Sequence, residues 1–504
     1  MNRTKRCLTK WAAMILALAV GIPWSPPSRA EDSPVATQPA AQPAATTEPA
    51  ATTPPTADQR LEELEKEVAL LQQEIAALKN DSTPVMKTAA LTEPSAGGGS
   101  AGAGALNPAS ADDAPPKITI ASLLGPITLS GFGDVYYGYD NNHPFDNLSG
   151  LRSFEAPTNG FNFNMAELIL DKAPDATSAE SRLGYHISAG YGYAAKLING
   201  SDNTGFDPSD SNFFLKEAYV SYLAPVGKGL TITVGKFVTP MGAEVIESNA
   251  NWNYSRGLLF NYAIPFFHFG ANAKYAFNPK WALTGYLVNG WNNTIINHAA
   301  PFGTSSGLTY GASLAYTPNM KWSVTENYFA GPVSDGIGLS GQTLDDWKQI
   351  SDTVIGYTPN SKWAFQLNGD YGFGPRSYGP CSDIGGSPGG TSSCAPSSSF
   401  DWWGVASYAK YTWNPKTNFA VRYEYFDDPQ GYAGLTAGSR GWAQEITGTY
   451  SYNLTSALLI RGEYRYDFAS LPIFEQSLSN DKFVKEQNTA TISFVYSFSS
   501  ANLK

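Results

Sequence analysis

Polar or charged side chains alternate with apolar ones in several segments in the C-terminal half of this 504-residue chain. The clearest run lies within 458–468, where the charged residues are Arg461, Glu463, Arg465 and Asp467 and most of the others are aromatic or aliphatic. Because successive side chains of a β-strand point to opposite faces, the charges share one face and the apolar residues share the other. A charged face that meets water can order ions and polar solutes.

A second group of charges could face this run from a long segment between two predicted strands, 239–265. The six residues that we select as candidates for a pore constriction are Glu244, Glu247, Arg256, Arg422, Arg461 and Arg465. Acids on the segment opposite arginines on a wall would produce a transverse electric field, which orders polar solutes and disfavours apolar ones. The alternative is that Glu244 and Arg256 only pin the segment through an ion pair.

The sequence shows no pattern of residues that is typical of catalysis, of metal binding or of a cofactor site. The four histidines, His143, His186, His268 and His298, are scattered without the spacing of a metal site. No local signature supports a Ser–His–Asp group, and no glycine-rich phosphate loop leads into a helix. We therefore predict a protein that is not an enzyme, with no catalytic residues, no metal and no cofactor.

The composition favours strands that cross a membrane. Aromatic residues make up 13% of the chain and charged residues 15%, where a soluble globular protein has about 25% charged residues. After residue 30, no apolar run reaches the roughly 18 residues of a spanning helix. Short turns that join aromatic segments recur, as in 275–281, 316–322 and 357–363, each with Asn and Lys before a Trp. Turns with flanking Tyr and Trp are typical of a membrane–water boundary.

We predict sixteen strands, most of them as long as the roughly 9–11 residues that cross a bilayer at a tilt. They start near Ile127, Phe161, Arg182, Asn212, Leu230, Phe266, Trp281, Leu308, Lys321, Asp346, Trp363, Phe400, Asn418, Gly441, Ser456 and Gln487. The predicted fold is all-β, a closed antiparallel transmembrane barrel, because its charged face needs a wet lumen. Connections after even-numbered strands are mostly short turns, and those after odd-numbered strands are long. Because the number of strands is even, we expect the first and the last strand to have their free ends on the same side as the short turns, the periplasm.

The chain before the barrel divides into four segments. Residues 1–30 predict a signal peptide, with a basic start, an apolar run and small residues at a cleavage site. Residues 31–59 are rich in Ala, Pro and Thr and predict a disordered tether. A coiled coil is expected over 60–80, a flexible linker over 81–117 and the barrel over 118–504. Removal of 1–30 changes the formal net charge from −11 to −16, which argues against nucleic acid as a partner.

The coiled-coil segment has an unbroken heptad pattern. Its apolar residues are Leu61, Leu64, Val68, Leu71, Ile75 and Leu78, at spacings of three and four. In a parallel assembly Arg60 would face Glu65 of a neighbour, and Glu74 would face Lys79. The alternative is a single amphipathic helix, but about 20 residues alone are only marginally stable in water. We predict a parallel self-associating helix on the periplasmic side.

Two cysteines, Cys381 and Cys394, remain after processing, and both lie in one Gly/Ser/Pro-rich loop. An oxidising exterior favours a disulfide between them. Metal binding would need further ligands nearby, and the loop offers none.

The stretch Gly235-Lys-Phe-Val-Thr-Pro-Met-Gly-Ala-Glu244, followed by 247–249, 253–256 and 265–270, resembles the OmpL-like β-barrel porin family 2. The resemblance extends from about Ile118 to the C-terminus, and it implies an outer-membrane channel without enzymatic activity. In general porins the third long loop narrows the pore, which by analogy assigns this role to 239–265. Heptads of this composition favour two helices, whereas barrels of this type more often form trimers, so we favour a trimer with a dimer as the alternative.

The predicted function is a porin of the outer membrane that gives passive diffusion of small hydrophilic solutes or ions, with membrane lipid around the barrel. The alternative is a structural envelope tether, in which the barrel is a membrane anchor and the coiled coil contacts peptidoglycan or a partner. An anchor needs only about eight strands, so sixteen strands favour a channel.

The heptad pattern predicts the result of replacing two core positions. Leu71→Lys together with Ile75→Lys should reduce cross-linking of the full chain to oligomers, because two charges would then be buried per helix. The barrel should stay folded. Gln73→Lys with Ala76→Lys adds the same charge to the outer face and serves as the control. Unchanged cross-linking of the core variant would contradict the coiled coil.

Overall fold

The computed structural model describes residues 125, 127–179, 181–199, 212–296, 307–333, 347–374, 400–435, 440–476 and 482–500. The chain divides into two compact units, Met1–Ala105 and Leu106–Lys504, and the described residues all belong to the second. The predicted signal peptide, tether, coiled coil and linker lie outside the described residues. So do Cys381 and Cys394, and their disulfide stays a prediction.

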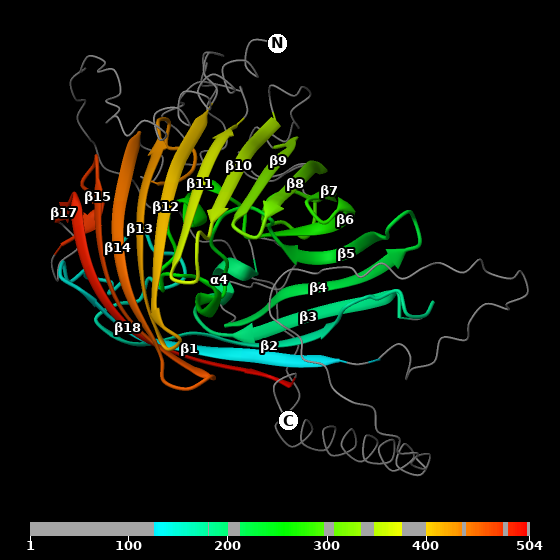
Figure 1. Cartoon of the computed structure of the whole chain (residues 1–504). Coiled ribbons are helices and arrows are strands. Elements are labelled where there is room, and N and C mark those ends of the chain that lie inside the picture. The colour runs from blue at the N-terminus through cyan, green and yellow to red at the C-terminus, as the bar shows by residue number, and fades with distance from the viewer. Residues whose placement is uncertain are drawn as a thin grey trace, which may run out of the picture. The chain divides into compact units, whose positions relative to one another are not determined.

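Sixteen strands form one closed barrel in which each strand is antiparallel to both neighbours (Figure 1). The barrel closes where β1 pairs with β18, from Ser130 opposite Ser499 to Asp140 opposite Thr489. The strands are β1 (Thr128–Asp140), β2 (Gly160–Lys172), β3 (Leu183–Tyr191), β4 (Phe213–Ala224), β5 (Leu230–Val238), β6 (Phe267–Asn278), β7 (Trp281–Val288), β8 (Thr309–Asn319), β9 (Trp322–Pro332), β10 (Trp347–Tyr357), β11 (Trp363–Phe373), β12 (Asp401–Asn414), β13 (Thr417–Asp428), β14 (Gly441–Asn453), β15 (Leu458–Ala469) and β18 (Glu486–Ser499). The predicted barrel and its strand number are confirmed, and each predicted start lies within two residues of the observed one.

Strands β13 and β15 present opposite chemistry on their two faces, as the alternation predicted. In β13, Phe419, Val421 and Tyr423 are exposed on the outside, whereas Arg422 and Glu424 are fully buried on the inside. The same arrangement in β15 exposes Tyr464 outside and buries the four alternate charged residues. The barrel is thus apolar outside and polar inside, which suits a bilayer around it.

The repeated turns owe their shape to asparagine side chains. The Oδ1 atom of Asn278 accepts hydrogen bonds from the N–H groups of Lys280 and Trp281, at 2.9 and 3.1 Å. Asn319, Asn360 and Asn414 accept the equivalent bonds in their own turns. Aromatic rings stack beside these turns across neighbouring strands, with Trp281 and Tyr316 at a centroid distance of 4.0 Å. The sequence motif therefore produces both the turn and the aromatic girdle at the short-turn end of the barrel.

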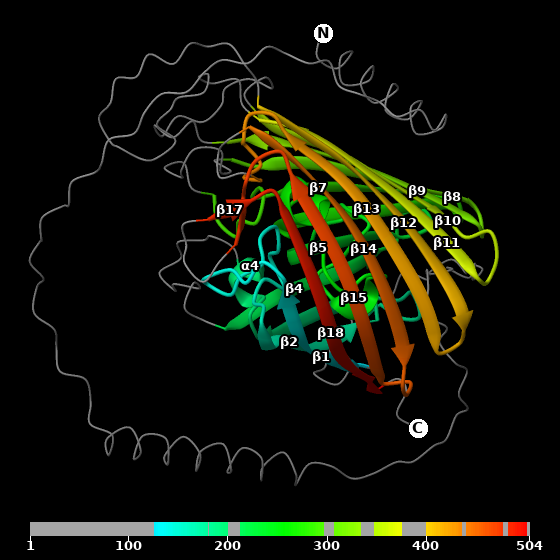
Figure 2. The same cartoon turned by 90° about the vertical axis from the view of Figure 1, so that its left-hand side faces the viewer.

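Long connections at the other end carry the remaining elements. They include the helix α4 (Ala195–Ile198), the 3-10 turn η2 (Ser248–Ala250), the π-helical turn η3 (Leu259–Ala263) and a small hairpin of β16 (Phe474–Glu475) and β17 (Phe483–Val484). None of the helices in the described residues is long and apolar enough to cross a membrane. In both views, α4 and the green segment that follows β5 lie inside the ring of strands (Figure 1, Figure 2).

Candidate functional site

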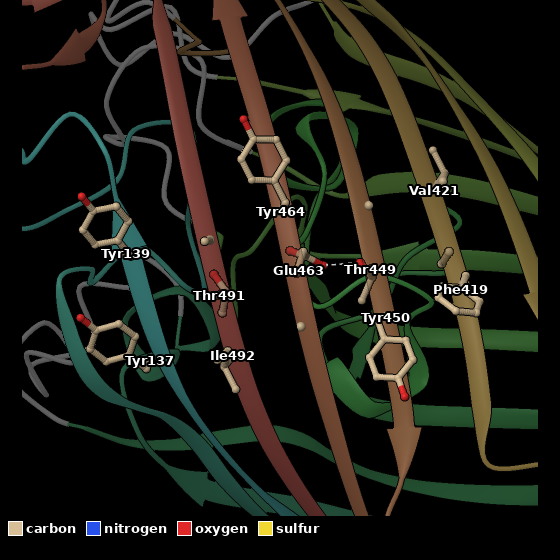
Figure 3. A pocket seen from close by; sticks show the side chains of 14 residues that line it. Tyr137, Tyr139, Phe419, Val421, Thr449, Tyr450, Glu463, Tyr464, Thr491 and Ile492 are labelled. Carbon is tan, nitrogen blue, oxygen red and sulfur yellow. Dashed lines mark hydrogen bonds between the residues drawn. The ribbon is translucent and has the colours of Figure 1, made fainter.

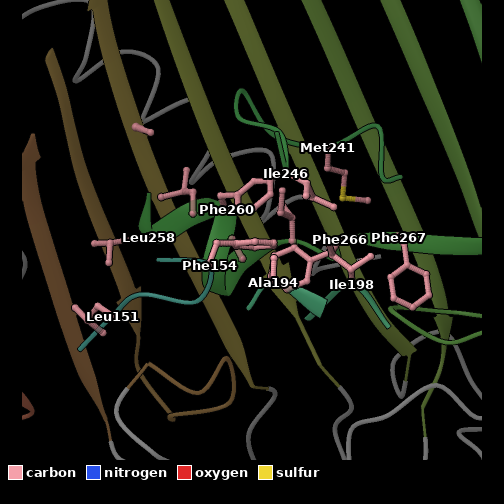
Figure 4. Close-up of a cluster of buried hydrophobic side chains, with 14 of the residues drawn as sticks. Leu151, Phe154, Ala194, Ile198, Met241, Ile246, Leu258, Phe260, Phe266 and Phe267 are labelled. Atoms are coloured by element: carbon pink, nitrogen blue, oxygen red, sulfur yellow. The ribbon is translucent and has the colours of Figure 1, made fainter. Parts of the chain in front are cut away.

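Two long connections fold into the barrel and pack together there. The first loop (141–159) contributes Phe154, and the third loop (239–266) contributes Phe260 and Phe266. The ring of Phe154 lies 5.3 Å from that of Phe266 and 5.7 Å from that of Phe260, between centroids. Ile198 of α4 belongs to the same buried cluster (Figure 4). The interior at this level is thus a packed apolar core surrounded by a polar wall.

Arg422 of β13 joins the third loop to the wall. Its Nη1 lies 2.5 Å from a carboxylate oxygen of Glu244 in the loop, and its Nε lies 2.6 Å from Glu445 of β14. It also donates to the carbonyl and the hydroxyl of Ser255. The side chains of Arg422, Glu244 and Glu445 are at most 4% exposed. Such a buried pair holds two segments together, because removing either partner leaves an uncompensated charge.

A glycine lets the loop approach this wall closely. The N–H of Gly257 donates to Glu244 at 2.6 Å, and the N–H of Leu258 donates to Glu424 of β13. A Cβ atom on Gly257 would overlap the Glu424 carboxylate. Only glycine at this position allows the wall carboxylate to reach the loop backbone.

The two arginines of β15 bind backbone carbonyls of the third loop. Arg461 donates to the carbonyls of Ser248 and Asn251, at 2.5 and 2.6 Å. Arg465 donates to the carbonyl of Arg256 at 2.7 Å and forms an ion pair with Asp467 at 2.8 Å. Carbonyl groups of an irregular loop need partners when they are buried, and these guanidinium groups provide them.

The first loop completes the attachment. Arg256 pairs with Glu155 at 3.2 Å, and Arg152 pairs with Asp467 at 2.8 Å. Burial raises the pKa of Glu155, while the nearby Arg256 opposes that shift. Burial together with Asp134 raises the pKa of Tyr254 well above its ordinary value. The Tyr254 hydroxyl therefore stays protonated and donates to Asp134 at 3.0 Å.

Glu247 ties the third loop to the other side of the barrel. Its carboxylate pairs with Lys216 of β4, which also pairs with Glu167 of β2 at 2.6 Å. The Glu247 side chain is 23% exposed, whereas the side chain of Lys216 is 1% exposed. Glu247 is therefore the most exposed of the six candidate residues.

The start of the third loop rests on carboxylate and amide groups of β10 and β11. The N–H of Gly242 donates to Asp352 and that of Ala243 donates to Asn368, each at 3.0 Å. Asp370 stands directly opposite Asp352 in the register. The buried side chains of these two residues share a hydrogen bond. Because a carboxylate has no donor, one of the two groups must hold a proton for this bond to form, which makes the pair costly at neutral pH.

All six candidate residues therefore lie where the third loop meets the inside of the wall. Ion pairs do hold the loop, but Glu244 and Arg256 do not pair with each other. Glu244 pairs with Arg422 of β13, and Arg256 pairs with Glu155 of the first loop. Their role as a constriction stays a proposal. Across the described ranges, no three His, Cys, Asp or Glu residues converge as a metal site.

The outside of the barrel carries a separate groove with a volume of about 630 Å³. It crosses β13, β14, β15, β18 and β1, above Gly448 and Gly462 (Figure 3). Tyr137, Tyr450 and Tyr464 stand on its margins, while Glu463 turns toward Thr449 on the inner side. The groove is lined by apolar atoms and faces away from the charged interior, so it has no part in handling polar solutes.

A family model, "Putative beta-barrel porin-2, OmpL-like", matches residues 126–498. The chain belongs to this family. Residues 126–498, which we call the porin-2 barrel, therefore form an outer-membrane barrel of the porin type, as the resemblance implied. No curated protein matches the sequence.

The solved structures to which the chain is similar include an outer-membrane channel and a porin. The porin-2 barrel is 14% identical to the channel DcaP of Acinetobacter baumannii, with a TM-score of 0.47, covering 74% of this chain and 97% of that one. It is also 14% identical to an anion-selective porin from Comamonas acidovorans, with a TM-score of 0.47 and coverages of 74% and 99%. OccK1 of Pseudomonas aeruginosa is 12% identical, with a TM-score of 0.39 and coverages of 74% and 98%.

Sequence reasoning missed several residues that hold the third loop of the porin-2 barrel. Asp352, Glu424 and Glu445 stand at alternate strand positions, a pattern from which they could have been found. Arg152 and Glu155 lie in an irregular loop whose sequence has no such pattern. Their partners are 315 and 101 residues away along the chain.

Replacement of Arg422 should release the third loop. Arg422→Met leaves Glu244 buried without its cation, at a cost of about 3–5 kcal/mol, while Glu445 keeps its ion pair with Arg465 at 3.4 Å. Hydrogen exchange at 242–258 should become faster, while exchange in the strands away from β13 stays slow. Arg422→Lys retains the charge and should show a smaller effect. Unchanged exchange in the Met variant would mean that the remaining contacts hold the loop.

Replacement of Asp370 should stabilise the barrel, whereas replacement of Arg422 destabilises it. Asp370→Asn supplies an N–H donor beside Asp352 in almost the same shape, so the barrel should gain on the order of 1 kcal/mol in stability. The free energy of unfolding in urea measures this change. Asp352→Asn is the matched control and should destabilise, because Asp352 already accepts from Gly242, Asn327 and Asn368. A loss of stability in the Asp370 variant would refute the prediction.

Proposed function

We propose that this protein is a narrow outer-membrane porin through which small hydrophilic solutes or ions diffuse passively. The observation that carries the proposal is the third loop, which enters a closed sixteen-stranded barrel and is held there by buried charges. A barrel of this size leaves an aqueous channel unless something narrows it. A loop attached at many points defines a channel of fixed width.

The proposed path follows the short-turn half of the inner face of β6 to β9. Nearer the long loops this face carries the buried His268, Val288 and Phe329. The start of the loop also contacts β6 and β9 there, through Thr239 and Pro240. The third loop is attached to β10, β11 and β13–β15 by the contacts described above, and its attachment to β4 is the pair of Glu247 with Lys216. On β6, β7 and β9 the inward side chains of Asn272, Thr284 and Thr325 keep part of their surface exposed. Lys274 on the same face is exposed. These short polar side chains suit hydrated solutes.

The proposed constriction consists of Glu244, Glu247, Arg256, Arg422, Arg461 and Arg465. In this proposal the buried pairs fix the position of the loop, and Glu247 supplies the charge nearest to the solute. Since the chain is acidic overall, with a formal net charge of −11, we expect a mild preference for cations. The preference should weaken at high salt, where screening acts within about 3 Å at 1 M.

The proposed assembly is a homo-oligomer in the outer membrane, with a trimer favoured over a dimer. The heptad segment 60–80 supports self-association, because its core and flanking charges suit a parallel coiled coil. We place the short turns and the N-terminal segments in the periplasm, where the even number of strands would put both ends of the barrel.

The constriction can be tested with the double variant Glu244→Gln and Glu247→Gln. Gln keeps the shape and the acceptor oxygen of each side chain, and Arg422 keeps its ion pair with Glu445. Two charges are lost, so single-channel conductance should change little and selectivity should move toward anions. Reversal potentials of the purified full chain in a salt gradient measure the selectivity. The single variants separate the exposed Glu247 from the buried Glu244, and we expect the larger shift from Glu247.

Deletion of 247–252 should instead raise conductance, because it removes side chains from the lumen. A selectivity that the double Gln variant leaves unmoved would put both acids outside the path and leave them a structural role. Absence of any conductance from a folded, lipid-inserted barrel would overturn the porin function itself.

A further inference from the structure

We propose that a row of lysines at the short-turn end of the barrel binds the anionic headgroups of phospholipids in the leaflet that borders these turns. We call this row the lysine arc. It consists of one lysine in each of the five consecutive short turns from β4–β5 to β12–β13, namely Lys228, Lys280, Lys321, Lys362 and Lys416. The proposal needs only a barrel in a bilayer and does not depend on what passes through the lumen.

Four lysines of the arc leave their turns in the same way. The backbone N–H of each donates to the side chain of an asparagine two residues earlier, at 2.8 or 2.9 Å. This bond fixes the turn, and with it the point from which the lysine side chain extends. All five lysine side chains of the arc are exposed. Because successive turns are two strands apart, they repeat at on the order of 10 Å. The arc is therefore a regular row of separate cations, not a single site for one ion.

The arc has no acid of its own to neutralise it. The chain has 44 acidic and 33 basic residues. Nevertheless, no Asp or Glu lies within four residues of any lysine of the arc along the chain. The ion pairs between described residues involve none of the five lysines. Acids occupy strand ends on the long-loop side instead, as Asp140, Asp401 and Glu486 do. A basic rim on an acidic chain is complementary to an anionic surface at that end.

Tryptophans beside the arc indicate its depth in the bilayer. Trp281, Trp322 and Trp363 each follow a lysine of the arc directly, and they are 38%, 42% and 41% exposed. Each packs on a tyrosine of the neighbouring strand, with ring centroids 4.0, 4.2 and 4.7 Å apart for Trp281–Tyr316, Trp322–Tyr357 and Trp363–Tyr411. Such rings gather at the level of the lipid headgroups. A lysine next to them has a long stem that carries its ammonium group to the phosphates.

An anionic phospholipid is the partner that this position and chemistry fit. The lysine ammonium is a compact cation with three N–H donors, which suits a phosphate oxygen. In Lys228 one donor already binds the carbonyl of Phe277 at 2.7 Å, and two remain. The rings beside the arc face hydrocarbon, which the acyl chains of a phospholipid supply and a cell-wall polymer does not. Basic residues next to a membrane-embedded segment attract anionic lipid.

The other two connections at this end lack the same chemistry. The connection between β2 and β3 carries the exposed Asp175, and 454–457 between β14 and β15 carries no charged residue. The arc therefore covers one continuous side of the barrel, from β4 to β13. We expect anionic lipid to collect along this side and not around the whole circumference.

Native mass spectrometry of the full chain tests the arc. After reconstitution in vesicles of equal parts phosphatidylglycerol and phosphatidylcholine, the released protein should retain phosphatidylglycerol over phosphatidylcholine by roughly fivefold. Equal retention of the two lipids by the parent protein would overturn the proposal.

Charge-matched variants assign the retention to the arc. The ratio should fall to near one when four lysines are replaced together, as Lys280→Gln, Lys321→Gln, Lys362→Gln and Lys416→Gln. The control removes four charges from exposed residues of the long connections and should keep the ratio, as Lys196→Gln, Arg440→Gln, Lys482→Gln and Lys485→Gln. Arginine at the four arc positions keeps the charge and should also keep the ratio. An unchanged ratio in the arc Gln variant would refute lipid binding by the arc.

The parent protein gives a second test that needs no variant. Phosphatidylglycerol with brominated acyl chains should quench the tryptophan fluorescence more than brominated phosphatidylcholine does at 0.1 M salt. The difference should disappear at 1 M salt, where screening acts within about 3 Å. A difference that persists at 1 M salt would contradict binding by the lysine charges.

Purified peptidoglycan distinguishes the other anionic partner at this end. The arc Gln variant and the parent should sediment equally with peptidoglycan. If the variant lost this binding and kept the parent's lipid ratio, the arc would contact the cell wall and the proposal would be wrong. Single-channel conductance should be the same in both proteins, so a failure of the porin function would leave the lipid result unaffected.

Discussion

The structure depends on the need to pair every backbone N–H and C=O group in a medium without water. A sheet in lipid meets this need only when its first and last strands pair, as β1 and β18 do over eleven residue pairs from Ser130–Ser499 to Asp140–Thr489. Closure separates an outside that meets hydrocarbon from an inside that can hold charge. The arginines and acids of β13 to β15 are stable only because the closed barrel keeps them away from lipid.

The charged residues inside the barrel attach the third loop to the wall. Buried arginines bind loop carbonyls and wall carboxylates together, so one cation satisfies several oxygens that would otherwise be buried alone. The third loop contains only short helical turns and lacks a regular hydrogen-bonding pattern of its own over most of its length. The wall supplies the missing donors and acceptors, which is why a loop of this kind can remain ordered inside a barrel.

Periodic features were predictable from sequence and irregular ones were not. The strands and the lumen-facing charges could be predicted because side chains alternate in β13 and β15. The turns could be predicted because the sequence repeats the pattern of Asn278 before Lys280 and Trp281. Pairing of Arg152 with Asp467 joins residues 315 positions apart and leaves no local trace. The hairpin of β16 and β17 was missed because strands of two residues are too short to show a period.

The attachment of the third loop has a consequence for the order of folding. The loop lies in the first half of the barrel sequence, between β5 and β6, but Arg422 lies 178 residues from Glu244, and Ser497 lies 248 residues from its partner Asn249. Contacts between residues so far apart in the sequence form late in folding, because the intervening chain must first be ordered. The lumen therefore stays hydrated while strands are added, and the packed interior appears only after the last strand is in place. A third loop that is packed in the lumen therefore indicates that the barrel has already closed.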